Sequence, residues 1–155
     1  MLEMKKYIQC LRIPHYIKNA IIFCPLFFNG SIAKTDLLIR CFFGFLSFCF
    51  LSSAIYVIND IHDIERDRNH PKKKERPIAS GKVLIGNAYI LLLILLIMCV
   101  TIIALMQLSL NASIFLIIYL GINIIYTLVG KHIPVLDIVC LGAGYPLRLL
   151  FGGVI

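Results

Sequence analysis

Four oxygen-bearing side chains lie close together in the sequence, directly after an apolar run that stops at Ile58. They are Asn59, Asp60, Asp63 and Asp67. If the helix expected for the apolar run continues past Ile58, a rotation of about 100° per residue places all four within roughly a quarter-turn. Carboxylates so close repel one another unless a cation lies between them, and their hard oxygen atoms suit Mg²⁺ bound to substrate phosphates. The spacing therefore predicts a site for magnesium and a diphosphate.

A cluster of cations follows the aspartates directly. It comprises Lys72, Lys73, Lys74, Arg76 and Lys82. Pro71 and Pro77 disfavour a regular helix here, so we expect a flexible basic loop. Such a loop can bind a diphosphate directly while the carboxylates bind it through the metal. Metal and cations together would stabilise the charge that develops on a diphosphate leaving group.

The lysines alone have a simpler interpretation. Loops on the cytoplasmic side of a membrane are rich in Lys and Arg for reasons of topology, and anionic lipid attracts them. Topology does not, however, require three aspartates on one helical face at a membrane boundary. The aspartates therefore carry the prediction of chemistry, and the lysines mainly indicate a side of the membrane.

The remainder of the chain has the composition of a membrane protein. Of its 155 residues, 60% are hydrophobic, whereas ordinary soluble domains contain about 45–50%. The 48 residues from Val83 to Gly130 contain no Asp, Glu, Lys or Arg, and one helical crossing of a bilayer needs only about 20 residues. A soluble globular domain is excluded, because it could not bury so much apolar surface.

Five apolar segments are expected to cross the membrane and to form one all-α transmembrane domain, residues 1–155, a polytopic helical bundle. They are residues 19–33, 41–58, 83–108, 114–129 and the stretch from 135 onward. The first contains Pro25 and would reach only about 22 Å as an α-helix, so we expect it to be short, kinked or partly re-entrant. Residues 1–18 alternate cations with apolar residues and are expected to lie on the membrane surface.

The distribution of Lys and Arg predicts the orientation of this bundle. With five crossings, twelve of these residues fall on one side: four in the N-terminal segment, seven between residues 60 and 82, and Lys131. Lys34 and Arg40 fall on the other side. We therefore expect the N-terminus, and residues 59–82 with their Asp-rich motif and basic loop, on the cytoplasmic side of a bacterial-type inner or plasma membrane.

The stretch NDIHDIERDRNHPKKKERPIASG, residues 59–81, resembles the first aspartate-rich motif of the UbiA superfamily of intramembrane prenyltransferases. That motif reads N-D-x-x-D-x-x-x-D, followed by H-P-x-K-x-x-R-P-x-x-S-G. Two further stretches resemble one branch of the superfamily, the polyprenyl-phosphate (decaprenyl-phosphate) phosphoribosyltransferases. They are residues 11–28, with Lys18 and Asn19 matching, and residues 126–153, with Tyr126, Lys131, Asp137 and Arg148 matching.

The resemblance implies an all-helical fold of about nine spans, of which this chain would be the N-terminal half with about five. A second aspartate-rich motif belongs to the later half of the family fold, so the chain alone is not expected to be active. The resemblance also implies Mg²⁺ as cofactor. The implied partners are an isoprenoid lipid substrate, a diphosphate-bearing donor, membrane lipid and a complementary C-terminal half, with no nucleic acid.

The resemblance assigns roles to individual residues. Asp60, Asp63 and Asp67 would be catalytic and, together with Asn59, would hold the Mg²⁺ ion. Six residues would contact substrate or diphosphate: Lys18, Lys73, Arg76, Tyr126, Lys131 and Arg148. Arg148 and Asp137 are 11 residues apart in the last apolar segment, so they would point the same way, into a protein interior or wet cavity, unless they are structural charges near its two ends.

Three functions are consistent with these residues. The first choice is transfer of a phosphoribosyl group from phosphoribosyl diphosphate to a polyprenyl phosphate. The second is transfer of a polyprenyl group from its diphosphate to an aromatic acceptor. The first aspartate-rich motif cannot distinguish these two reactions, because both use a magnesium-bound diphosphate. The third is a non-enzymatic membrane protein, or an inactive fragment, whose charged loop only fixes topology.

Overall fold

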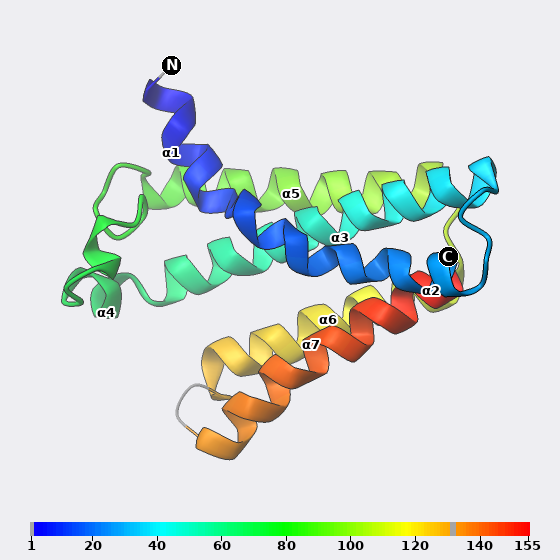
Figure 1. Ribbon diagram of the computed structural model, residues 1–155. Helices are drawn as coiled ribbons and strands as arrows, with labels where there is room; N and C mark the ends of the chain where they lie inside the picture. The colour runs from blue at the N-terminus through cyan, green and yellow to red at the C-terminus, as the bar shows by residue number, and fades with distance from the viewer. Residues whose placement is uncertain (1, 131–132) are drawn as a thin grey trace.

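The computed structural model describes residues 2–130 and 133–155, and these form a bundle of helices (Figure 1). The elements are α1 (Leu2–Leu11), the 3₁₀ helix η1 (Ile13–Phe23), α2 (Cys24–Phe28), α3 (Thr35–His62), α4 (Ile64–Arg68), the 3₁₀ turn η2 (Lys73–Glu75), α5 (Ile85–Leu105), α6 (Leu110–Leu128) and α7 (Pro134–Val154). The described residues contain no β-strand. The predicted all-α class is confirmed, and Lys131 lies outside the described residues.

Four helices are long and apolar enough to cross a membrane: α3, α5, α6 and α7. They correspond to the second through fifth apolar segments of the sequence. With 28 residues, α3 extends about 42 Å and exceeds the roughly 30 Å hydrocarbon core of a bilayer. A helix of this length can therefore extend beyond the hydrocarbon core, and its last turn carries Asn59 and Asp60.

The first apolar helical segment comprises residues 13–28 rather than the expected 19–33, so it begins within the stretch that was expected to lie on the membrane surface. Residues 13–23 form η1 and residues 24–28 form α2. Because a 3₁₀ helix rises about 2.0 Å per residue, the two together extend about 30 Å, which matches the hydrocarbon core. In Figure 1 the segment runs from the α4 end of the bundle to the end where α3 begins.

Helix α3 lies at the centre of the bundle. It packs against α5, η1, α1 and α6, while α7 packs against α6 and η1. Phe48 of α3, Phe151 of α7 and Ile22 of η1 meet in the core and are fully buried. A Cβ atom at Gly152 would lie 2.0 Å from the backbone oxygen of Ile22, so α7 approaches η1 this closely only because residue 152 is glycine.

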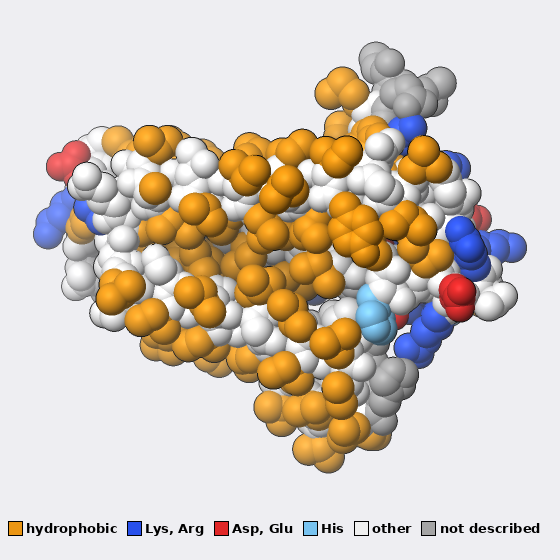
Figure 2. Space-filling view, turned by 180° about the vertical axis from the view of Figure 1, so that it is seen from behind, with side chains coloured by type: hydrophobic (Ala, Val, Ile, Leu, Met, Phe, Trp, Pro, Cys, Tyr) orange, Lys and Arg blue, Asp and Glu red, His pale blue; other side chains and the backbone are white. Residues whose placement is uncertain are grey.

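The outer surface is apolar along the length of the bundle and charged at its ends. Figure 2 shows hydrophobic side chains over the middle, with Lys, Arg, Asp and Glu gathered mainly at one end. On α5 the exposed side chains include Ile90, Leu93, Ile97 and Val100. Such a surface suits contact with lipid, as a spanning helix requires.

Candidate functional site

The aspartate motif lies across a bend between α3 and α4. The helix continues past Ile58, as a shared face for the four side chains requires, but α3 ends at His62 and Asp63 adopts a non-helical conformation (φ −94°, ψ 12°) before α4 begins. The backbone N–H of Asp63 still donates to the backbone carbonyl oxygen of Asn59 (3.0 Å), and the backbone N–H of Asp67 donates to the backbone carbonyl oxygen of Asp63 (2.8 Å). The helical path is thus bent rather than broken, and residues on either side of the bend can meet.

Two of the aspartates are buried and paired with arginines. Asp60 and Asp67 are 3% and 1% exposed. Arg76 donates from Nη1 to Asp60 Oδ1 (3.1 Å) and to Asp67 Oδ2 (2.6 Å), and Arg12 donates to the same Asp60 oxygen. Buried carboxylates need such partners, because an unpaired charge in a protein interior is costly. The basic part of the motif therefore folds back onto its acidic part.

Arg12 is held in place by an unusual backbone conformation. It lies between α1 and η1 in the left-handed region (φ 52°), which carries a cost for a residue with a side chain. Its guanidinium group lies over the ring of Tyr56, 4.6 Å from the centroid. The junction thereby places a cation on Asp60 that no spacing in the sequence indicates.

The other oxygens of the motif bear on whether a metal ion fits. Asn59 Oδ1 and Asp67 Oδ1 are buried without a hydrogen-bond partner, and Asp63, 12% exposed, lies 3.3 Å from the Nδ1 atom of His62. Unsatisfied hard oxygens are what a bound Mg²⁺ would satisfy. In residues 2–130 and 133–155, however, no three Asp, Glu, His or Cys side chains converge as a metal site. Here the guanidinium groups of Arg12 and Arg76 bind the carboxylates of Asp60 and Asp67.

Cys10 lies near Asp60 but is not a nucleophile. Burial, with the negative charge of Asp60 adding to it and Arg12 opposing it, raises the pKa of the Cys10 thiol to about 11. A thiol with that pKa is protonated at neutral pH and unreactive. The chemistry of this region therefore belongs to its carboxylates and cations.

Next to this cluster lies a cavity of about 510 Å³, which we call the cationic cavity. Its lining residues are Arg12, Lys18, Ser52, Ile55, Tyr56, Asn59, Lys73, Arg76, Tyr119, Asn123, Tyr126, Thr127, Cys140, Leu141, Gly144, Tyr145 and Arg148. Five of them are Lys or Arg, and none is Asp or Glu. The volume is that of a small-molecule site, and the charge favours an anion.

Most of the predicted substrate-binding residues meet at this cavity. The five that the structure describes all line it: Lys18, Lys73, Arg76, Tyr126 and Arg148. Of the predicted metal ligands only Asn59 does so. Asp137 interacts with Tyr126 but is absent from the lining, so the expectation that Asp137 and Arg148 share a cavity holds for Arg148 alone.

The basic loop is anchored, contrary to the expectation that it is flexible. His70 Nδ1 accepts hydrogen bonds from the backbone N–H groups of Lys72 and Lys73, both at 3.2 Å. Ile78 is buried in a core cluster, Ala79 is 5% exposed, and the backbone oxygen of Ala79 accepts a hydrogen bond from Arg68 Nε (3.1 Å). The buried apolar pair fixes the loop in a way that its charge and proline content do not suggest.

Anchoring gives neighbouring lysines different surroundings. Lys73 is partly buried and lines the cationic cavity, while Lys72, Lys74 and Lys82 are exposed. We expect Lys73→Ala to weaken pyrophosphate binding by about 10- to 100-fold, since a hydrogen bond to a charged group contributes about 1.5–3 kcal/mol. Lys74→Ala is the matched control and should leave the affinity nearly unchanged. Calorimetric titration of the protein in lipid nanodiscs measures both, and equal losses would contradict the placement of Lys73.

Several lining residues were not predicted from the sequence. Tyr119 and Asn123 line the cavity from α6 together with the predicted Tyr126. The intervals of four and three residues are a helical spacing that could have identified this polar stripe. Tyr56 lies three residues before Asn59 on the same helical face. Arg12 left no such signal, because its position depends on the backbone turn after α1.

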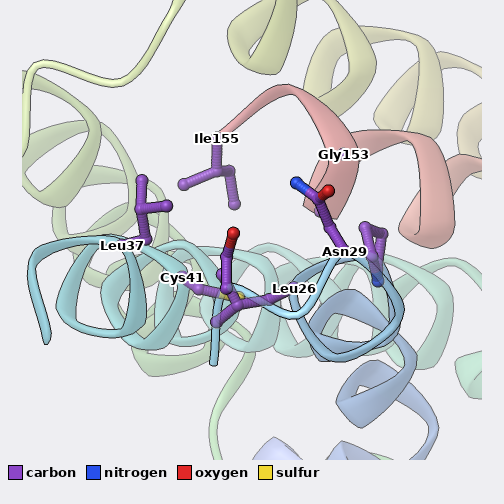
Figure 3. A pocket seen from close by; sticks show the side chains of 9 residues that line it. Leu26, Asn29, Leu37, Cys41, Gly153 and Ile155 are labelled. Carbon is purple, nitrogen blue, oxygen red and sulfur yellow. The ribbon is translucent and has the colours of Figure 1, made fainter. Parts of the chain in front are cut away.

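A smaller cavity of about 150 Å³ lies at the opposite end of the bundle. Figure 3 shows Leu26 and Asn29 facing Leu37 and Cys41 of α3 and the C-terminal residue Ile155. Its lining contains no charged side chain. This smaller cavity therefore lacks the charged groups that distinguish the cationic cavity.

Comparison with known families agrees with the motif and the fold. The sequence profile of the UbiA prenyltransferase family matches residues 21–155. The chain belongs to the UbiA prenyltransferase family. The predicted family is thereby confirmed, and with four apolar helices of spanning length this UbiA-family chain is an integral membrane protein.

Individual relatives come from more than one branch of the family. The chain is 33% identical over 149 residues to a decaprenyl-phosphate phosphoribosyltransferase of Corynebacterium glutamicum, covering 95% of this chain and 45% of the relative. It is 33% identical over 131 residues to a 4-hydroxybenzoate octaprenyltransferase of Legionella pneumophila, covering 81% of this chain and 45% of the relative. The chain thus spans about half the length of these relatives.

A solved structure supports the same fold. A digeranylgeranylglyceryl phosphate synthase matches with a TM-score of 0.83 and 26% sequence identity, over 99% of this chain and 53% of the other. The arrangement of helices around the cationic cavity is therefore that of a membrane prenyltransferase.

Proposed function

We propose that this chain forms the donor-diphosphate site of a UbiA-type membrane transferase. The observation that carries the proposal is the cationic cavity itself, lined by five Lys and Arg side chains and no carboxylate, beside a buried aspartate motif. A cavity of that charge at a membrane surface favours a small, highly anionic ligand. Lys73 and Arg76, from the anchored loop, would bind the diphosphate directly.

Magnesium is proposed as the cofactor of this site, held by Asn59, Asp60, Asp63 and Asp67. The unsatisfied oxygens of Asn59 and Asp67 support the proposal. In the structure Arg76 pairs with the carboxylates of Asp60 and Asp67, which the metal ion would neutralise when bound. When bound, Mg²⁺ would stabilise negative charge on the departing diphosphate. The protein would place Arg76 and Lys73 around that group and exclude water with the neighbouring spans.

For the donor and acceptor we favour phosphoribosyl diphosphate and a polyprenyl phosphate. Support comes from the Corynebacterium glutamicum relative, which aligns over more of this chain than the aromatic prenyltransferase does. Transfer of a prenyl group to an aromatic acceptor is the second candidate, supported by the Legionella pneumophila relative. In either case the isoprenoid would lie against the apolar spans.

Two further features of the whole protein are proposed. A complementary half of the family fold would complete the site, since the relatives contain about as much chain again as the aligned part. The cavity and motif would face the cytoplasm of a bacterial-type membrane. With five crossings, most of the Lys and Arg residues of the sequence fall on the same side as residues 59–82, and such residues are enriched on the cytoplasmic side.

The test compares donors in the presence of Mg²⁺, with the chain in lipid nanodiscs. Phosphoribosyl diphosphate should bind saturably and more tightly than farnesyl diphosphate, and Asp63→Ala should weaken it at least about tenfold, the effect of losing about 1.4 kcal/mol. Glu65→Ala, which removes an exposed carboxylate of α4 outside the motif, is the control. Preference for farnesyl diphosphate would favour the aromatic branch, and binding of neither donor would refute the proposed function.

A further inference from the structure

Arg148 is a buried cation without an anionic partner. It lies within α7, is 8% exposed, and donates from Nε to Asn19 Oδ1 (2.7 Å), from Nη1 to the Gly144 oxygen (2.7 Å) and from Nη2 to the Tyr119 hydroxyl (2.8 Å). All three acceptors are neutral. None of the ion pairs within residues 2–130 and 133–155 includes Arg148. Since a charge in a membrane span is costly and commonly marks a substrate path, an anion is the missing partner.

The guanidinium group is held rigidly and still has donors available. Asn19, 1% exposed, is fixed in turn by Cys49 Sγ (3.3 Å) and Ser52 Oγ (3.5 Å). The ring of Tyr119 lies 5.0 Å from the guanidinium carbon. The three hydrogen bonds use three of the five N–H groups of an arginine. Because Arg148 lines the cationic cavity, the other two can serve a ligand there.

Arg148 is held, through Asn19, at a different position along α3 from the arginines at the aspartate motif. Its partner Asn19 contacts Ser52 of α3, whereas Arg12 and Arg76 bind Asp60. Ser52 and Asp60 are eight residues apart on α3, which corresponds to about 12 Å along the helix. The two groups of arginines are therefore anchored about two helical turns apart along α3, although all three line one cavity.

We propose that Arg148 forms a second anion subsite in the cationic cavity and that this subsite takes a phosphate monoester. The inference rests on the proposed function, in which Lys73 and Arg76 bind the diphosphate, and it moves Arg148 from the diphosphate-binding set to a separate role. The 5-phosphate of a phosphoribosyl donor and the phosphate of a polyprenyl acceptor share this chemistry. Tyr119 and Tyr145, which also line the cavity, would flank the bound group.

The first test needs no variant. The chain in lipid nanodiscs is saturated with Mg²⁺ and pyrophosphate, and ribose 5-phosphate or farnesyl phosphate is then titrated. Two subsites predict that one of these monoesters still binds, with one pyrophosphate and one monoester per chain. Mutual exclusion, or no monoester binding at all, would overturn the inference while leaving the proposed function intact. Absence of pyrophosphate binding would instead refute the proposed function.

Variants then locate the second subsite. Arg148→Gln should weaken monoester binding at least about tenfold and leave pyrophosphate binding within about twofold, whereas Lys73→Ala should do the reverse. Arg148→Lys keeps the charge and should recover part of the affinity, and the wild-type competition decides if Arg148→Gln does not fold.

The identity of the affected monoester assigns the source of the phosphate. If Arg148→Gln weakens binding of ribose 5-phosphate, the subsite takes the 5-phosphate of the donor. If it weakens binding of farnesyl phosphate, the subsite takes the phosphate of the acceptor. Binding of 4-hydroxybenzoate at Arg148 in place of either monoester would contradict the inference, because the subsite would then take a carboxylate.

Discussion

Arg76→Ala is expected to lower the free energy of unfolding by about 2–3 kcal/mol. Arg76 bridges Asp60 and Asp67, so its loss leaves buried negative charge with less compensation, and removing one partner of a fully buried pair costs about 3–5 kcal/mol. We expect less here because the Arg76 side chain is 25% exposed and Arg12 stays on Asp60. Unfolding with SDS in mixed micelles, followed by circular dichroism, measures the change.

Arg66→Ala is the matched control for this prediction. Arg66 belongs to the same charged stretch but is exposed, so its truncation should change stability by less than about 0.5 kcal/mol. The double variant Arg76→Ala with Asp67→Asn should be more stable than the sum of the single effects, since the neutral amide no longer needs a cation. Equal effects of Arg66→Ala and Arg76→Ala would show that the buried bridge does not form.

Gly152→Ala should disturb both stability and ligand binding. A Cβ atom there would lie 2.0 Å from the backbone oxygen of Ile22, so α7 and η1 must separate, and overpacking of this kind costs about 1–3 kcal/mol or more. The hydrogen bond from Arg148 to Asn19 crosses the same interface. We therefore expect a lower unfolding free energy in mixed micelles together with weaker binding of anions to the cationic cavity.

The neighbouring glycines provide controls for this effect. A Cβ atom at Gly153 would meet Pro25 only at 4.0 Å, and at Gly142 it would meet nothing within 4 Å. Alanine at either position should leave stability within about 0.5 kcal/mol of the wild type. If Gly152→Ala is as stable as Gly153→Ala, the packing of α7 on η1 is incorrect.

The parts of the fold that follow from local rules could be predicted from the sequence. Long apolar runs identified the four spanning helices, because hydrophobic length is a direct requirement of the bilayer. The shared face of the aspartates was inferred on the condition that the helix passes Ile58, and α3 does continue to His62. The bend at Asp63 was missed because one non-helical residue leaves no mark on a periodic pattern.

Features that depend on tertiary contacts could not be predicted. The 3₁₀ form of η1 escapes a sequence pattern because the same residues would also suit an α-helix. The docking of the basic loop depends on burial of Ile78 against residues of other helices. The pairing of Arg12 with Asp60 joins residues 48 positions apart, and nothing near either residue indicates the other.

The substrate-binding set was brought together mainly by resemblance. Lys18, Tyr126 and Arg148 are far apart in the sequence, yet they line one cavity with Lys73 and Arg76. Each was named because it matched a family pattern, since single basic or aromatic residues carry little information alone. Tyr119 and Asn123 show that helical spacing within an apolar span can add residues that such a match omits.

Calorimetric titration of the wild-type chain in lipid nanodiscs with pyrophosphate, with and without Mg²⁺, tests the central claim most directly. If the cationic cavity and the aspartate motif form a donor-diphosphate site, pyrophosphate binds saturably at one per chain and more tightly, by at least about tenfold, when Mg²⁺ is present. Absence of saturable binding, or an affinity that does not depend on Mg²⁺, would contradict the account.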